Sequence, residues 1–170
     1  MLNLLRKSVA RKREGARLYG LLVERARAPV FFRDFGVSDS IDGRFDMVAL
    51  HGWMALSALK AAGAGEAAQG LTDTIFIGFD EAMREQGAGD MGLSRKMKAF
   101  AGAFFGRIAA YEDAADADTL AAALARNLYR GAAVDWRSRV LADYVLAARA
   151  HLNASVPHAL DFGPLPVPAP

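Results

Sequence analysis

Three glycines have the spacing of a nucleotide-binding loop. Gly87, Gly89 and Gly92 follow the order G-x-G-x-x-G, and a basic run comes directly after them. In a dinucleotide-binding loop the first glycine ends a buried strand, and amide N–H groups of the next helix bind the pyrophosphate. Here the helix-forming residues 80–86 separate the apolar run TIFIGF from Gly87. We therefore interpret the glycines as a corner between two helices. A nucleotide-dependent enzyme that binds its nucleotide with residues 87–92 remains a further hypothesis, after the two given at the end of this subsection.

Other residues that could do metal or nucleophilic chemistry are scattered. No two of His51, His151 and His158 have the i, i+4 spacing of a zinc site, and a lone histidine on an apolar face is typical of a core residue. Ser94, in GLSRK, lacks the second glycine of a G-x-S-x-G elbow. The absence of cysteine excludes disulfides, thiolate metal sites and a cysteine nucleophile. The sequence predicts no catalytic residue, no metal site and no cofactor, which favours a binding protein over an enzyme.

Positive charge is concentrated at the start of the chain. Residues 1–27 carry a net charge of +6 and the remainder −4, for a total of +2. The stretch LNLLRKSVARKR places Leu2, Leu5 and Val9 on one helical face and cations on the other. Such a segment can bind anionic lipid, nucleic acid or a ribosome, serve as a transit peptide, or be only a solvated helix face. The candidate membrane or ribosome contacts are Arg6, Lys7, Arg11, Lys12, Arg13 and Arg17.

Hydrophobic periodicity predicts helices along most of the chain. The expected helices cover about residues 16–27, 47–62, 71–86, 93–111, 119–130 and 134–153. Pro29 ends the first, Asp46 caps the second, and Asp116 or Asp118 caps the fifth. The turn formers in residues 31–46 indicate a loop. The second helix is apolar on nearly all sides, which predicts that it is central.

The chain is therefore predicted to be an all-α, single-domain multi-helix bundle with irregular loops. Its parts are a basic amphipathic segment (1–15), a helical domain (16–156) and a Pro-rich extended tail (157–170). The longest strongly apolar run, residues 47–59, is shorter than the roughly 20 residues that a membrane-spanning helix needs. We expect no membrane span.

The helix expected from about residue 93 has the clearest apolar period. Its stripe consists of Met97, Phe100, Ala101, Phe104, Phe105, Ile108 and Tyr111. An aromatic stripe of this kind is more often core than a ligand site. On the same helix, Gly102 and Gly106 would let another backbone approach closely.

Five separated blocks between Leu18 and Gly131 resemble the ubiquinol-cytochrome c chaperone family. The blocks are LYGLLVERARAPVFF, DGRFDMVALH, LTDTIFIGFDEAMREQGAGDMGLSRKMKAF, FFGRIAAYEDA and ARNLYRG. The resemblance implies a non-enzymatic assembly factor of the cytochrome bc complex (complex III of the respiratory chain) that acts on newly made cytochrome b. It also implies work at the inner membrane, with a small partner chaperone and near the ribosome. The Ala- and Arg-rich composition is more like that of a bacterial member.

The resemblance implies a set of partner-binding candidates. They are Arg44, Asp46, His51, Asp80, Arg84, Glu85, Asp90, Lys96, Lys98, Arg107 and Tyr111. Gly87, Gly89, Gly106, Asn127 and Tyr129 complete the family-like positions. About two thirds of these positions can be explained by the fold alone, with Arg84 and Arg107 pairing with Asp80 or Asp90 around a buried corner. Lys96 and Lys98 are the better contact candidates, because lysine is seldom buried.

Our hypothesis is an assembly chaperone that binds nascent cytochrome b in an apolar helix groove and contacts an anionic membrane peripherally. For a bacterial member this is the cytoplasmic face of the inner membrane, and for a eukaryotic one the matrix side of the mitochondrial inner membrane. The alternative is a ribosome- or RNA-contacting helical adaptor that uses the basic segment with Lys96 and Lys98. No sequence-specific nucleic-acid partner is expected.

Overall fold

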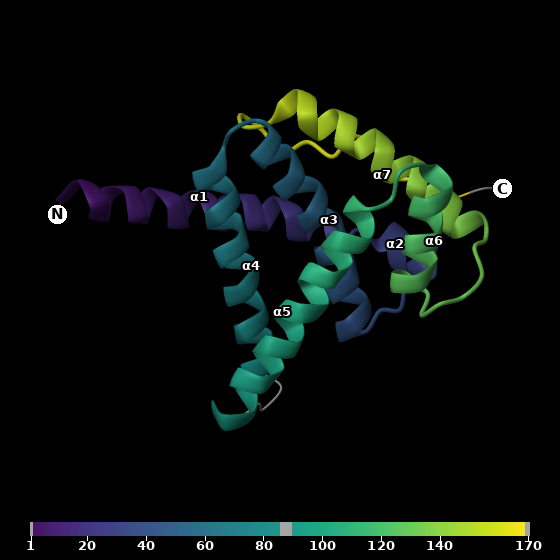
Figure 1. Cartoon of the computed structure of the whole chain (residues 1–170), viewed down its shortest axis with the longest axis horizontal. Helices are drawn as coiled ribbons and strands as arrows, with labels where there is room; N and C mark the ends of the chain where they lie inside the picture. The colour runs from purple at the N-terminus through teal and green to yellow at the C-terminus, as the bar shows by residue number, and fades with distance from the viewer. Residues whose placement is uncertain (1, 86–89, 169–170) are drawn as a thin grey trace.

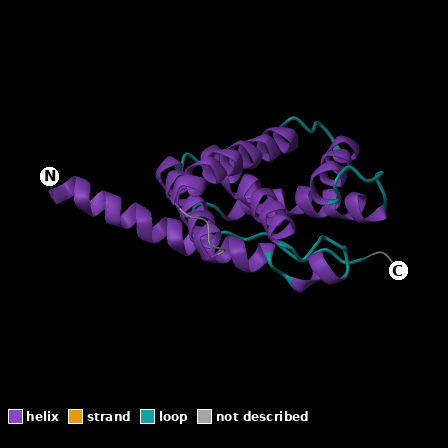
Figure 2. Cartoon of the chain, turned by 90° about the horizontal axis from the view of Figure 1, so that it is seen from below, coloured by secondary structure: helices purple, strands orange, loops and turns teal. Residues whose placement is uncertain are grey.

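The computed structural model describes residues 2–85 and 90–168, and helices dominate this part of the chain (Figure 1). The helices are α1 (Leu2–Ala26), α2 (Pro29–Arg33), α3 (Ile41–Ala61), α4 (Gly65–Glu85), α5 (Asp90–Glu112), α6 (Ala117–Leu128) and α7 (Trp136–Ser155). The described residues contain no strand (Figure 2). The prediction of an all-α bundle is confirmed.

Helix α3 lies at the centre and contacts α1, α4, α5, α6 and α7. Buried side chains point from almost all of its sides, as its sequence predicted. Its start was predicted wrongly, because the hydroxyl of Ser40, not the carboxylate of Asp46, caps it by accepting from the Gly43 N–H at 3.2 Å. Residues 40–46 are mostly polar or turn-forming, which predicted a loop, whereas residues 41–46 are helical and Phe45 is buried.

Helix α1 is continuous from Leu2 to Ala26, and its first half projects beyond the body of the molecule (Figures 1 and 2). Its middle crosses α4 at close range. A Cβ on Gly15 would collide with the carbonyl of Gly70, and one on Gly70 would meet the carbonyl of Arg11. The close approach expected at Gly102 and Gly106 is not found, since nothing lies within 4 Å of a Cβ at either position.

Several helix boundaries differ from those predicted, because tertiary packing overrides local breakers. The soft break expected over residues 63–70 is shorter, and α4 already begins at Gly65. Ala68 and Gly70 are buried there, which keeps this glycine-containing turn helical. Helix α5 begins at Asp90, ahead of Leu93. Of the two caps expected for α6, Asp116 and Asp118, the structure shows Asp116, whose carboxylate accepts from the Thr119 N–H at 2.8 Å.

Residues 159–168 form no helix and lie against the body. Leu160 and Phe162 are buried, and the Phe162 ring lies 5.3 Å from the His51 ring. A guanidinium N–H of Arg25 donates to the carbonyl of Gly163. This tail therefore closes one side of α3, next to α7.

Candidate functional site

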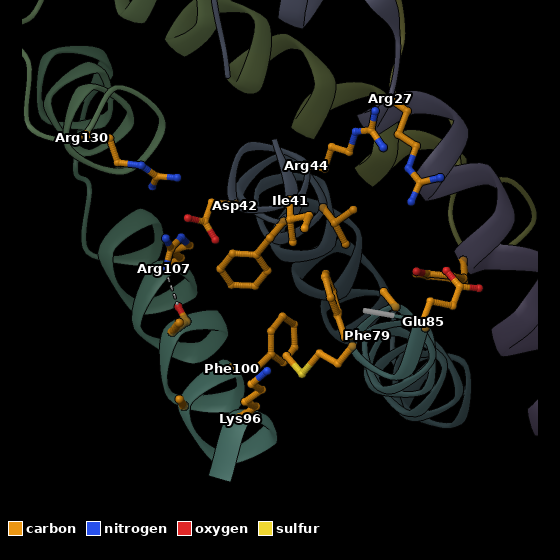
Figure 3. Close-up of a pocket in the computed structure, with 18 residues that line it drawn as sticks. Arg27, Ile41, Asp42, Arg44, Phe79, Glu85, Lys96, Phe100, Arg107 and Arg130 are labelled. Carbon is orange, nitrogen blue, oxygen red and sulfur yellow. Dashed lines mark hydrogen bonds between the residues drawn. The ribbon is translucent and has the colours of Figure 1, made fainter. Parts of the chain in front are cut away.

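A groove of about 760 Å³ opens on the other side of α3, between that helix, α4, α5 and the end of α1 (Figure 3). Its floor is aromatic. The ring centroids of Phe79 and Phe100 lie 3.9 Å apart, and the Phe45 ring lies 4.7 Å from that of Phe100. Val48 and Met83 extend the floor. Side chains three or four positions apart on each helix share a face, so the helical period supplies this surface.

Cations line the rim of the groove. They are Arg27, Arg44, Lys96, Arg107 and Arg130, and the exposed acids beside them are Asp42 and Glu85. Figure 3 shows the cations on several sides of the aromatic rings. A concave surface with an excess of one charge concentrates ligands of the opposite charge. The groove thus combines an apolar floor with a rim that attracts anions.

A buried carboxylate fixes two of these cations. Asp46 is fully buried, and its Oδ1 accepts from Nε of Arg107 at 2.6 Å. Nη1 of Arg130 lies 2.8 Å from the other carboxylate oxygen. Burial raises the pKa of the Asp46 carboxyl, and the two guanidinium groups oppose that rise. We expect the carboxylate to stay ionised, because an unpaired arginine beside it would be costly.

The pairing of Arg107 corrects the prediction, which gave it Asp80 or Asp90 as partner. The guanidinium of Arg107 also lies over the Phe45 ring, 4.6 Å from its centroid. Arg84 does pair with Asp80, at 2.8 Å, but on an exposed face of α4 rather than a buried corner. Asp46 directly precedes the apolar run of residues 47–59, and an acid buried with such a run requires a cation from elsewhere in the chain.

Three predicted partner-binding residues, Asp46, His51 and Tyr111, lie in the core, out of reach of a partner in this conformation. The carbonyl of Met47 can only accept, so Nδ1 of His51 donates to it at 2.8 Å. Nε2 of His51 then accepts from the Tyr144 hydroxyl, also at 2.8 Å. Burial lowers the pKa of His51 to about 4. It is a satisfied core histidine, as its position on an apolar face indicated.

The remaining candidates are divided between the groove and other surfaces. Arg44, Glu85, Lys96 and Arg107 line the groove. Lys98 is exposed outside it. The Asp90 side chain and Gly87 and Gly89 are outside the described parts, whereas Gly106 is exposed. Burial raises the pKa of the Tyr129 hydroxyl, which donates to the carbonyl of Phe35 at 2.8 Å.

The basic-segment candidates lie along α1. Arg6, Lys7, Lys12 and Arg13 are exposed. Arg17 pairs with Glu14 at 2.7 Å, and Arg11 lies half-buried, 3.7 Å from Glu66 of α4.

Most residues that line the groove are not among the predicted site residues. They include Arg27, Ile41, Phe45, Phe79 and Arg130. Sequence reasoning also assigned Phe105 to the core, whereas this side chain is 52% exposed. Ile41 and Phe45 fell in the expected loop, so nothing local indicated a helical surface there. The period of α4 placed Phe79 on an apolar face without distinguishing a groove from a core.

The part of the chain that the structure covers was also compared with the requirements of a metal site, a membrane span and a nucleotide-binding loop. Within it, no group of three His, Asp or Glu residues could hold a metal ion. None of its helices is long and apolar enough to cross a membrane. The segment that leads to Gly87 is helix α4 up to Glu85, so the strand that a dinucleotide loop requires does not precede it.

The fold and the groove define a class of protein: a single-domain helical protein with an open aromatic groove and a basic rim. The family model described as Ubiquinol-cytochrome C chaperone matches residues 33–160, and the chain belongs to this family. The protein is similar to the Cbp3 homolog from Brucella abortus, whose crystal structure is known. The two are 37% identical, the match covers 94% of this chain and 92% of that one, and the TM-score is 0.78. No curated protein matches.

Proposed function

We propose that the protein is a non-enzymatic assembly chaperone of ubiquinol-cytochrome c reductase, and that its groove holds a segment of newly made cytochrome b. Family membership supports the assembly role. The observation that carries the binding proposal is the open groove and its aromatic floor, where the half-buried Phe79 packs on the mostly buried rings of Phe45 and Phe100. Burial of one Leu or Phe side chain of a client would contribute about 2 kcal/mol. Several such anchors would hold a client without any covalent chemistry.

Deletion of the gene in its own organism tests the assembly role. We expect selective loss of b-type haem and of cytochrome b protein from the membranes, measured by difference spectra and by immunoblot. The cytochrome b message and the other respiratory complexes should be unchanged. Normal cytochrome b in the deletion strain would contradict the proposal.

We also propose that the projecting half of α1 contacts an anionic membrane peripherally. The contact would lie on the cytoplasmic face in a bacterium, or on the matrix face of the inner membrane in a mitochondrion. Arg6, Lys7, Lys12 and Arg13 are exposed there, and Val9 is 65% exposed. A cation near an anionic lipid surface contributes about 1 kcal/mol. This attraction would keep the chaperone close to a membrane-bound client.

Co-sedimentation with vesicles of phosphatidylglycerol and phosphatidylcholine tests the membrane contact. Truncation before Ala16 would remove part of the α1–α4 crossing, so the test uses full-length variants. The first variant replaces Arg6, Lys7, Lys12 and Arg13 with Gln. The control replaces four exposed cations outside α1 with Gln, namely Lys60, Lys98, Arg126 and Arg139. We expect only the first variant to lose binding, and equal binding of both would reject the contact.

The second candidate function is contact with the ribosome, because the same projecting cations can bind the phosphates of ribosomal RNA. Binding through phosphates falls steeply with salt and survives detergent. Binding of a client through the aromatic floor should resist salt. Sedimentation with ribosomes in detergent, at low and high salt, separates ribosome contact from client binding. Ribosome contact predicts binding in detergent that is lost at high salt.

A further inference from the structure

We propose that the groove selects an amphipathic polypeptide segment that carries carboxylates beside its apolar side chains. This inference rests on the proposed function, because it names the chemistry of the client segment that the groove holds.

The charge on the rim is only partly neutralised, because Arg107 and Arg130 share one buried carboxylate, that of Asp46. Arg27 and Lys96 make no ion pair with the residues that the structure describes, and Arg44 pairs with Asp39, which does not line the groove. Asp42 and Glu85 also make no such pair. With the buried Asp46 counted, five cations therefore face three acids around one floor, and positive charge remains in excess. A carboxylate-bearing segment complements this surface.

The cations lie close enough to the floor for one segment to contact both. Arg107 lies over the Phe45 ring and is held by the buried Asp46, so its position is set before a ligand arrives. Arg130 is held by the same carboxylate. A guanidinium group can donate two parallel hydrogen bonds to a carboxylate, and one that is already in place loses little freedom on binding. The apolar anchor and the acid of the client should therefore be near neighbours.

The composition of the rim favours a polypeptide over a lipid headgroup. Asp42 and Glu85 lie among the cations and would repel a carboxylate as they would a phosphate. A peptide can satisfy these two acids with its own N–H groups or cations, whereas the phosphatidylglycerol headgroup carries no cation. A single peptide segment supplies acids, donors and apolar side chains together, as this groove requires.

The test measures binding of two labelled helical peptides to the full-length protein by fluorescence anisotropy. Both peptides carry the same Leu and Phe face, and one has Glu where the other has Gln on the flanking positions. We expect the Glu peptide to bind at least about tenfold more tightly in low salt, and this preference to shrink in about 0.3 M salt.

Lys96 and Lys98 provide a matched pair of variants. They are two positions apart on α5 and both exposed, but only Lys96 lines the groove. We expect Lys96→Gln to weaken binding of the Glu peptide about threefold, as is usual for a rim charge, and Lys98→Gln to leave it unchanged. Replacement of Arg27, Arg44 and Lys96 with Glu should reverse the preference in favour of a Lys-bearing peptide.

Two results would overturn the inference. Equal binding of the Glu and Gln peptides would mean that the floor alone selects the client. The groove would be a lipid site if the protein bound phosphatidylglycerol vesicles but neither peptide, and if Lys96→Gln reduced the binding of the vesicles. Equal peptide binding would leave the assembly role intact, because that role is tested separately by cytochrome b levels in the deletion strain.

Discussion

The two sides of α3 bury polar groups in different ways. On the closed side, His51 lies under Phe31, Tyr144 and Phe162 and is neutral, with both ring nitrogens hydrogen-bonded. On the open side, Asp46 draws in arginines from α5 and from the segment after α6. A neutral group can be buried with neutral hydrogen-bond partners, whereas a buried carboxylate needs cations. On the open side those cations extend to the surface and border the groove.

The largest effect expected from this comparison is loss of the Asp46 carboxylate. Asp46→Ala leaves Arg107 and Arg130 without their partner, so we expect the free energy of unfolding to fall by about 3 kcal/mol. Urea denaturation followed by circular dichroism measures the change. Asp42→Ala, at an exposed position on the same helix, should change it by less than about 0.5 kcal/mol. Equal effects of both variants would contradict a structural role for Asp46.

Opening the closed side should have the next largest effect. Phe162 is 3% exposed and contacts His51. Phe162→Ala should lower the free energy of unfolding by about 2 kcal/mol, the transfer free energy of one buried Phe side chain. Leu165→Ala, in the same tail but 43% exposed, serves as the control. Hydrogen exchange should rise around His51 only in the Phe162 variant. Unchanged exchange would mean that the tail does not seal this side.

The neutral state of His51 predicts acid sensitivity. Its pKa is about 4 in the folded protein and 6.5 in the unfolded chain, so between these values the unfolded state binds the extra proton. Stability should therefore be complete above pH 6.5 and fall as the pH drops toward 4, by up to about 1.4 kcal/mol per pH unit. Urea titrations at pH 7, 6 and 5 measure this slope. The slope should be smaller in His51→Gln, and an identical slope would reject the assignment.

The smallest effect on stability is expected at the mouth of the groove. Ile41 is 59% exposed and lines it, whereas Ile77 of α4 is 53% exposed and does not. Replacing either with Gln should change stability by less than about 0.5 kcal/mol. In the deletion strain, however, Ile77→Gln should restore cytochrome b and Ile41→Gln should restore less of it. Equal rescue by both would place the client elsewhere.

Features set by local chemistry could be predicted from the sequence. An aspartate cap at position 116 or 118, the central position of α3 and the apolar surroundings of His51 follow from short-range patterns, although His51 was also a partner-binding candidate. The groove does not, because the same helical period produces core and open surfaces. Phe104 is fully buried, its neighbour Phe105 is 52% exposed, and Phe100 lines the groove. The partners of Asp46 could not be assigned either, since Arg107 is 61 residues away in the chain.

Photo-crosslinking in cells would show whether newly made cytochrome b lies in the groove. A photoreactive amino acid at position 41 or 77 of the full-length protein would be activated in cells while cytochrome b is being synthesised. We expect a crosslink from the position of Ile41 and none from that of Ile77. A crosslink from Ile77 alone, or from neither position in cells that accumulate cytochrome b, would contradict the claim that the groove holds the client.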